Sequence, residues 1–120
     1  MALAIKDGLD QGAAVTLLAD RIRPGGKSRA AEFLGASAPF PCAPWELATA
    51  LGVPVILCFG IYEGGNRYHL QFEMLTDRIV KERDGGLPVA AWIQRFAHHL
   101  ALRVRSEPFN WFNFYDFWSG

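Results

Sequence analysis

The side chains best suited to bind a ligand lie in one charged segment near the start of the chain. It holds one carboxylate and four cations within ten residues: Asp20, Arg21, Arg23, Lys27 and Arg29. It follows "AAVTLLAD" (13–20), a short apolar run typical of a strand buried on both faces. Ligands of open α/β sheets bind beyond the carboxyl ends of strands, and Arg holds phosphate or carboxylate through paired hydrogen bonds. The pattern indicates an anion site, although a solvated loop would carry the same residues.

The three histidines do not form a metal or catalytic set. His98 and His99 fall on a predicted helix, where adjacent side chains point about 100° apart, which makes a poor joint metal site. His69 alternates onto the polar side of a predicted strand. No Ser-His-Asp arrangement and no Gly-rich phosphate loop is recognisable. We therefore expect no metal and no bound cofactor.

The composition narrows the classes of function. Hydrophobic residues make up 51% of the 120-residue chain, enough for a core, and twelve basic residues balance twelve acidic ones. A net charge of zero argues against a general nucleic-acid binder, which needs a basic face. The two cysteines, Cys42 and Cys58, are too few for a disulfide framework. These features predict a reduced, cytoplasmic setting.

The hydropathy pattern argues against a chain that crosses a membrane. Lys6, Asp7 and Asp10 interrupt the apolar residues at the N-terminus, unlike the start of a signal peptide. No run reaches the ~18 apolar residues of a spanning helix. Contact with a membrane surface remains compatible with the sequence.

The elements that must position these residues follow from periodicity and turn signals. They comprise three helices and three strands: helix 1–11, strand 13–20, helix 44–51, strands 53–62 and 67–75, and a helix from Pro88 to Val104. Strand 53–62 is expected to be buried on both faces, and 53–75 to form an antiparallel hairpin. On its second strand, Tyr68, Leu70, Phe72 and Met74 should face the core. We predict one α/β domain over 1–120, with a small mixed sheet and flanking helices. Three strands are few for such a sheet, so part of it is expected to be missing.

Arg103 and the C-terminal aromatic residues each admit two interpretations. Arg103 lies within the apolar stripe of the last helix, where its stem can snorkel or its head can meet a buried carboxylate. Seven of the last twelve residues are Phe, Trp or Tyr. They either complete the core, with Trp111 and Phe112 docked on the sheet or on a partner chain, or face a membrane or an acyl chain.

Three stretches in the same order resemble one enzyme family. They are "AAVTLLADR", "FLGASAPFPCAPWELATALGVPVILCFGIYEGGNRYHLQFE" and "EPFNWFNFYDFW". Together they resemble bacterial acyltransferases of the lysophospholipid and lipid A late-acyltransferase superfamily. Ala43 stands where Gly is usual. The resemblance implies an α/β acyltransferase domain of which this chain is the C-terminal part.

The family's catalytic motif is absent. These enzymes use H-x-x-x-x-D, in which Asp orients a His that acts as general base. The positions five after the three histidines here hold other residues: Met74, Arg103 and Val104. The resemblance therefore assigns no catalytic residue to this chain. It does imply substrate-binding roles for Asp20 and Arg21 in the cleft, with Arg23 beside them, and a wall shaped by Gly35 and by Phe40 of the "PFP" stretch. The helix that begins at Pro44 would point its N-terminus at a phosphate.

The implied reaction is transfer of a fatty acyl group from an acyl carrier protein or coenzyme A thioester to a hydroxyl of a lipid or glycolipid. Two alternatives remain: a non-catalytic module that binds an acyl chain or a partner, and a structural domain that self-associates. In each case we expect a homo-oligomer, because a sheet that lacks part of its strands exposes an edge and an apolar face. The expected location is the cytoplasm, with peripheral contact at the inner face of the cell membrane.

Overall fold

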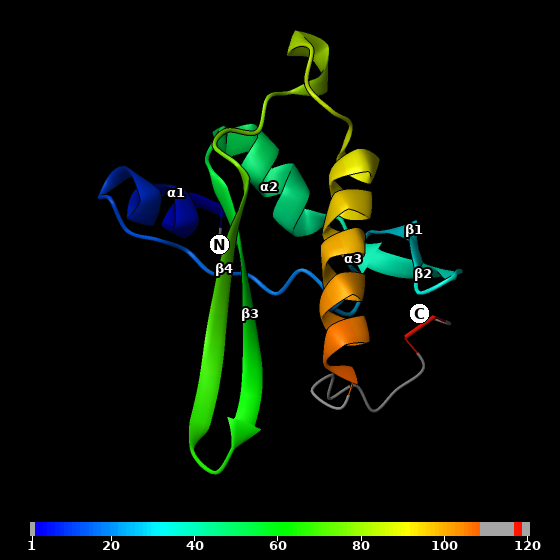
Figure 1. The fold of residues 1–120 in the computed structure, drawn as a ribbon. Helices are drawn as coiled ribbons and strands as arrows, with labels where there is room; N and C mark the ends of the chain where they lie inside the picture. Colours follow the sequence, from blue (N-terminus) through cyan, green and yellow to red (C-terminus); the bar gives the residue numbers. More distant parts are fainter. Residues whose placement is uncertain (1, 109–116, 119–120) are drawn as a thin grey trace.

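The computed structural model describes residues 2–108 and 117–118. This part of the chain forms three α-helices, two β-hairpins and one short 3-10 helix, and Figure 1 shows how they are arranged. In chain order they are α1 (Ala2–Asp10), β1 (Ser28–Phe33), β2 (Ala36–Pro41), α2 (Ala43–Leu51), β3 (Val55–Gly64), β4 (Arg67–Thr76), η1 (Glu82–Asp84) and α3 (Val89–Ser106). The α/β class is confirmed. The described strands form two separate antiparallel pairs, β1–β2 and β3–β4.

The helices begin and end where the sequence predicts. Pro44 occupies the first turn of α2, and Gly52 ends that helix in the left-handed region at φ 63°. Pro88 stands just before α3 with an extended backbone. The two signals agree with the usual placement of Pro at the start and Gly after the end of a helix. In the described part of the chain, no helix is both long enough and apolar enough to cross a bilayer.

The β1–β2 hairpin was not predicted. Its two-residue turn is Leu34-Gly35, with φ of 52° and 87°, a conformation that matches the twist of a tight hairpin. Ala31 and Phe33 on β1 alternate with exposed neighbours, which is the period of a half-buried strand. Pro39 and Pro41 on β2 hide this pattern, because proline is confined to the edges of sheets. Both strands of a two-stranded hairpin are edge strands, so β2 can accommodate Pro39 and Pro41.

Helix α3 holds the β1–β2 hairpin in place. The side-chain amide of Gln94 accepts a hydrogen bond from the backbone N–H of Glu32 at 2.8 Å and donates one to its C=O at 2.9 Å. Gln94 thus pairs with the free edge of β1 as a neighbouring strand would. Beneath this contact, Phe33, Phe40 and Ile93 are almost fully buried. The core therefore lies between α3 and the first hairpin.

The prediction of a buried strand at 13–20 is wrong. Residues 13–18 have no regular secondary structure, and residues 19–20 form a bend. Val15, Leu17 and Leu18 are exposed, Leu18 by 73%. A strand buried on both faces needs neighbours to pair with its backbone. No described strand pairs with this segment, and its apolar residues remain near the surface.

The hairpin at 53–75 is confirmed, but the burial predicted for it is wrong. Only Leu57 of β3 is buried. On β4 the apolar residues expected in the core are the exposed ones, with Tyr68 and Phe72 each 67% exposed. The opposite face carries Gln71 and Glu73, which contact α3 through Arg103. At this junction the ion pair adds to the apolar packing of Leu57 and Phe59, so the alternation was predicted correctly and the buried face was assigned to the wrong side.

Candidate functional site

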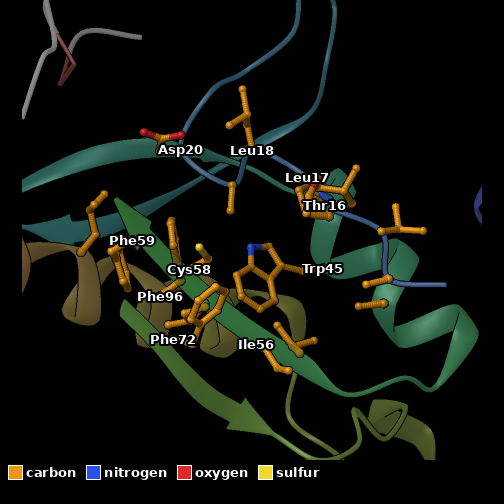
Figure 2. A pocket seen from close by; sticks show the side chains of 18 of the residues that line it. Thr16, Leu17, Leu18, Asp20, Trp45, Ile56, Cys58, Phe59, Phe72 and Phe96 are labelled. Carbon is orange, nitrogen blue, oxygen red and sulfur yellow. The ribbon is translucent and has the colours of Figure 1, made fainter. Parts of the chain in front are cut away.

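An apolar cavity of about 630 Å³ lies between segment 14–20, α2, β3 and α3. Figure 2 shows the side chains that surround it, with Leu17 and Leu18 on one side and Ile56, Cys58 and Phe59 of β3 on another. Trp45 of α2 lies between them. The volume of the cavity falls within the ~300–1,000 Å³ range of small-molecule sites. A cavity with this lining favours an apolar ligand.

The inner wall of the cavity consists of core side chains. Trp45 is 3% exposed and Phe96 of α3 is 7% exposed, and their ring centroids lie 5.9 Å apart. Leu100, one turn further along α3, continues this wall. Within the described residues, Nε1 of Trp45 is buried and has no hydrogen-bond partner. Because these rings also hold α2 against α3, the wall is a fixed part of the fold.

Few polar side chains border the cavity. Asp20, Arg103 and Glu107 are the charged residues in its lining, and Thr16 adds a hydroxyl. The three histidines do not line it. Among the described residues, no cluster of three or more His, Cys, Asp or Glu side chains could hold a metal ion. The lining can therefore bind an apolar chain and orient a polar end, and it offers no histidine for proton transfer.

Arg103 connects the cavity to a polar cluster between α3 and β4. Its guanidinium donates hydrogen bonds of 3.0 Å to Oε1 of Gln71 and 3.0 Å to Oε2 of Glu73, and it lies 4.7 Å from the ring centroid of Phe59. Nδ1 of His99 is 3.1 Å from the same Glu73 oxygen. Of the two interpretations of Arg103, contact with a carboxylate is the one observed, and Glu73 is only partly buried.

The cluster changes the acidity of Glu73. Hydrogen bonding from Arg103 lowers the pKa of the Glu73 carboxyl below its ordinary value, and the charges of His99 and Arg103 act in the same direction. Partial burial opposes them by disfavouring the ionised form. Because the lowering effects prevail, Glu73 stays ionised at neutral pH and holds Arg103 in its orientation beside the cavity.

The six residues assigned to substrate binding are found in different places. Asp20 and Pro44 line the cavity. Arg21 and Arg23 are exposed and do not belong to its lining. Phe40 is fully buried in the core, and Gly35 lies in the β1–β2 turn. The structure thus brings Asp20 and Pro44 to one site and does not bring the other four there.

Most of the cavity wall was not singled out from the sequence. Trp45, Phe96 and Leu100 follow ordinary helical spacing, so they are indistinguishable from core residues. The continuous apolar run at 13–20 includes this part of the wall, but its pattern predicts a buried strand. Exposure of such a run beside a sheet edge is visible only in three dimensions.

The chain was compared with protein-family models, with curated proteins and with solved structures. None of them matches it.

Proposed function

We propose that this chain is an acyltransferase-like module that binds the apolar chain of an acyl donor or of a lipid acceptor in the cavity beside Trp45. The observation that carries the proposal is the cavity itself, about 630 Å³ in volume and lined mainly by apolar side chains. Burial of a hydrocarbon chain contributes ~0.8 kcal/mol per CH₂, so such a lining suffices for affinity without specific polar contacts. The resemblance in sequence adds the substrate class.

The polar groups suit the end of such a ligand. Asp20 on segment 14–20 and Arg103 on α3, together with Glu107 and Thr16, border a space whose other lining residues are mainly apolar. A long-chain thioester or a lipid has this same division into an apolar chain and a polar end. Sites of this kind combine apolar walls with a few polar groups that fix orientation. We propose that the acyl chain of the ligand packs against the apolar wall, and that its headgroup or thioester lies beside Asp20 and Arg103.

Catalysis requires a group that the described residues do not supply at this site. Acyl transfer to a hydroxyl needs a general base within hydrogen-bond reach of the acceptor. His69, His98 and His99 lie outside the cavity lining. We therefore expect the 120-residue chain to bind acyl compounds without turning them over. Loss of such a base typically lowers a rate ~10²–10⁴-fold.

Binding can be measured with a fluorescent long-chain fatty acid titrated into the purified chain. Ala48 of α2 lines the cavity, and Ala48→Phe should weaken binding at least about tenfold by filling it. Ala50→Phe, on the exposed side of the same helix, is the matched control and should bind like the unchanged protein. Equal affinity of both variants and the unchanged chain would place the ligand elsewhere and overturn the proposal.

Thioester-dependent acylation of a lysolipid is the second measurement. We expect the rate with the purified chain to stay near that of the uncatalysed reaction. Turnover at typical enzyme rates would instead show that another residue acts as the base. The alternative of a non-catalytic binding module predicts the same binding and the same absence of turnover.

A further inference from the structure

The exposed face of the β3–β4 hairpin is a continuous apolar surface. The strand register pairs Ile56 with Met74, Cys58 with Phe72, Gly60 with Leu70, and Tyr62 with Tyr68. Successive residues of a strand point to opposite faces. Phe59, Gln71 and Glu73 contact Arg103 of α3, so these eight residues lie on the face that points away from α3. Every one of the eight is exposed. We call this set of four pairs the hairpin face.

The hairpin face is large enough to matter for association. Tyr68, Phe72, Leu70, Met74 and Ile56 are each more than half exposed. Taking ~200 Å² for each large side chain, they and Tyr62 present roughly 600 Å² of apolar surface. The largest apolar patch on a typical monomer covers ~300–600 Å² and is often functional, so this face is at the upper end of that range. Two such faces buried together would amount to roughly 1,200 Å², the lower end of the range for specific protein interfaces.

The charges are arranged so that a second copy can cover this face. None of the eight residues is charged, whereas Glu63 and Arg67 flank the turn end and Asp77 and Arg78 follow the other end. A two-fold axis that passes through the centre of the face, parallel to the strands, would place the turn end of one copy beside the turn end of its partner, with β3 of one copy over β4 of the other. Each end carries one acid and one base, so opposite charges can pair. The net charge of the chain is zero, so long-range repulsion between copies is absent.

The shape of the hairpin face supports the same arrangement. At its centre β3 contributes the small residues Cys58 and Gly60, while β4 contributes Leu70 and Phe72. Rotation about a two-fold axis sets the large row of one copy against the small row of the other. Sheets that pack face to face in this way lie ~10 Å apart with interdigitated side chains. Figure 1 shows that the turn end of this hairpin extends away from α1 and α2, which leaves room for a partner.

We propose that two copies of this chain form a symmetric dimer by packing their hairpin faces together. The dimer does not depend on the proposed acyl-binding function, since its mass is measured without ligand. It affects the same region, because Ile56, Cys58 and Phe72 belong both to the hairpin face and to the cavity lining. In the dimer the partner copy would form an outer wall of the cavity.

Sedimentation equilibrium of the full 120-residue chain is the test. The unchanged protein should sediment as a dimer at micromolar concentration. Leu70→Glu places a charge at the centre of the hairpin face and should raise the dimer dissociation constant at least about tenfold. Leu102→Glu, at a leucine of α3 that is 43% exposed, is the matched control and should dimerise normally. A monomeric unchanged chain, or equal effects of the two substitutions, would overturn the proposal.

A second measurement applies even if Leu70→Glu fails to fold. Cys58 is exposed near the centre of the hairpin face, and Cys42 is buried. A short bis-maleimide should therefore link two unchanged chains through Cys58, and Cys58→Ser should abolish the linked dimer. Absence of the linked dimer at micromolar concentration would contradict the proposal, and flotation of the unchanged chain on phosphatidylcholine vesicles would then identify a lipid surface as the occupant.

Discussion

Nε1 of Trp118 donates a hydrogen bond of 3.0 Å to the backbone C=O of Phe33, 85 residues earlier in the chain. The neighbouring Phe117 is 3% exposed, and its ring centroid lies 5.3 Å from that of Phe33 and 5.4 Å from that of Phe40. These two residues near the C-terminus therefore complete the core over the β1–β2 hairpin. The predicted docking of Trp111 and Phe112 lies outside the described residues.

Truncation of Phe117 should destabilise the whole fold. Its ring fills the space between Phe33 and Phe40, so Phe117→Ala removes a buried ring and leaves a cavity. Substitutions of this kind cost ~3–5 kcal/mol in the free energy of unfolding. Urea denaturation followed by tryptophan fluorescence measures the loss. Trp118→Phe, which removes mainly the hydrogen bond to Phe33, should cost only ~1 kcal/mol. Equal effects of the two changes would show that Phe117 does not belong to the core.

Gly35 is predicted to matter for stability and not for ligand binding. It has a φ of 87°, and a Cβ added there would meet no atom within 4 Å, so strain in the backbone is the only cost of a side chain. Gly35→Ala should lower the free energy of unfolding by ~1–2 kcal/mol. Affinity for the fluorescent fatty acid should stay unchanged, because Gly35 is remote from the lining of the large cavity. Ser37→Ala, an exposed position on β2, is the control and should change stability by less than ~0.5 kcal/mol. Weaker fatty-acid binding by folded Gly35→Ala would restore the role implied by the family resemblance.

Local signals in the sequence were sufficient for the helices and for one hairpin. Pro44, Gly52 and Pro88 fix helix ends through backbone geometry alone, so their effect needs no tertiary information. The β3–β4 hairpin follows in the same local way from alternation and from the Gly65-Asn66 turn.

The rest depended on contacts between distant segments. Alternation on β4 shows that its two faces differ. Contacts between distant residues, such as the pairing of Arg103 with Glu73 and the burial of Leu57, decide which face lies against α3. The prolines of β2 obscured the strand pattern of the β1–β2 hairpin. Whether residues 13–20 form a strand depends on a partner strand, which the local sequence does not reveal. For the candidate site, Asp20 was singled out by the charged segment and by the family resemblance, and Pro44 by the resemblance alone, whereas Trp45 and Phe96 have the pattern of any core residue.

The contact between Glu73 and Arg103 should make stability sensitive to acid. The pKa of Glu73 is lowered in the folded protein, so its ionisation stabilises the fold above the unfolded pKa of about 4.3. This contribution is lost as the pH falls through the lower folded value. The difference in unfolding free energy between the unchanged chain and Glu73→Gln should therefore be present at pH 7 and disappear in strong acid. Urea denaturation across this range measures it.

A double-mutant cycle tests the assignment to this pair. Arg103→Met and Glu73→Gln remove the same hydrogen bond, so their combined effect at pH 7 should be smaller than the sum of the single effects. Additive effects would show that the two side chains are not coupled, and the acid sensitivity would then have to originate in another group.

Ligand binding should order segment 14–19. In the described part of the chain, the backbone N–H groups of these residues form no backbone hydrogen bond, whereas that of Ala13 bonds to Gly8 at 2.9 Å. Amides without such bonds exchange quickly with solvent. Because residues 14–19 form one wall of the cavity, an acyl chain bound there would pack against them and restrict their opening.

Hydrogen exchange with the fatty acid present should slow in this segment and change little in β1 and β2. The Ala48→Phe variant should show no such slowing. Protection of 14–19 that persists in this variant would mean that the segment is ordered by a contact outside the cavity.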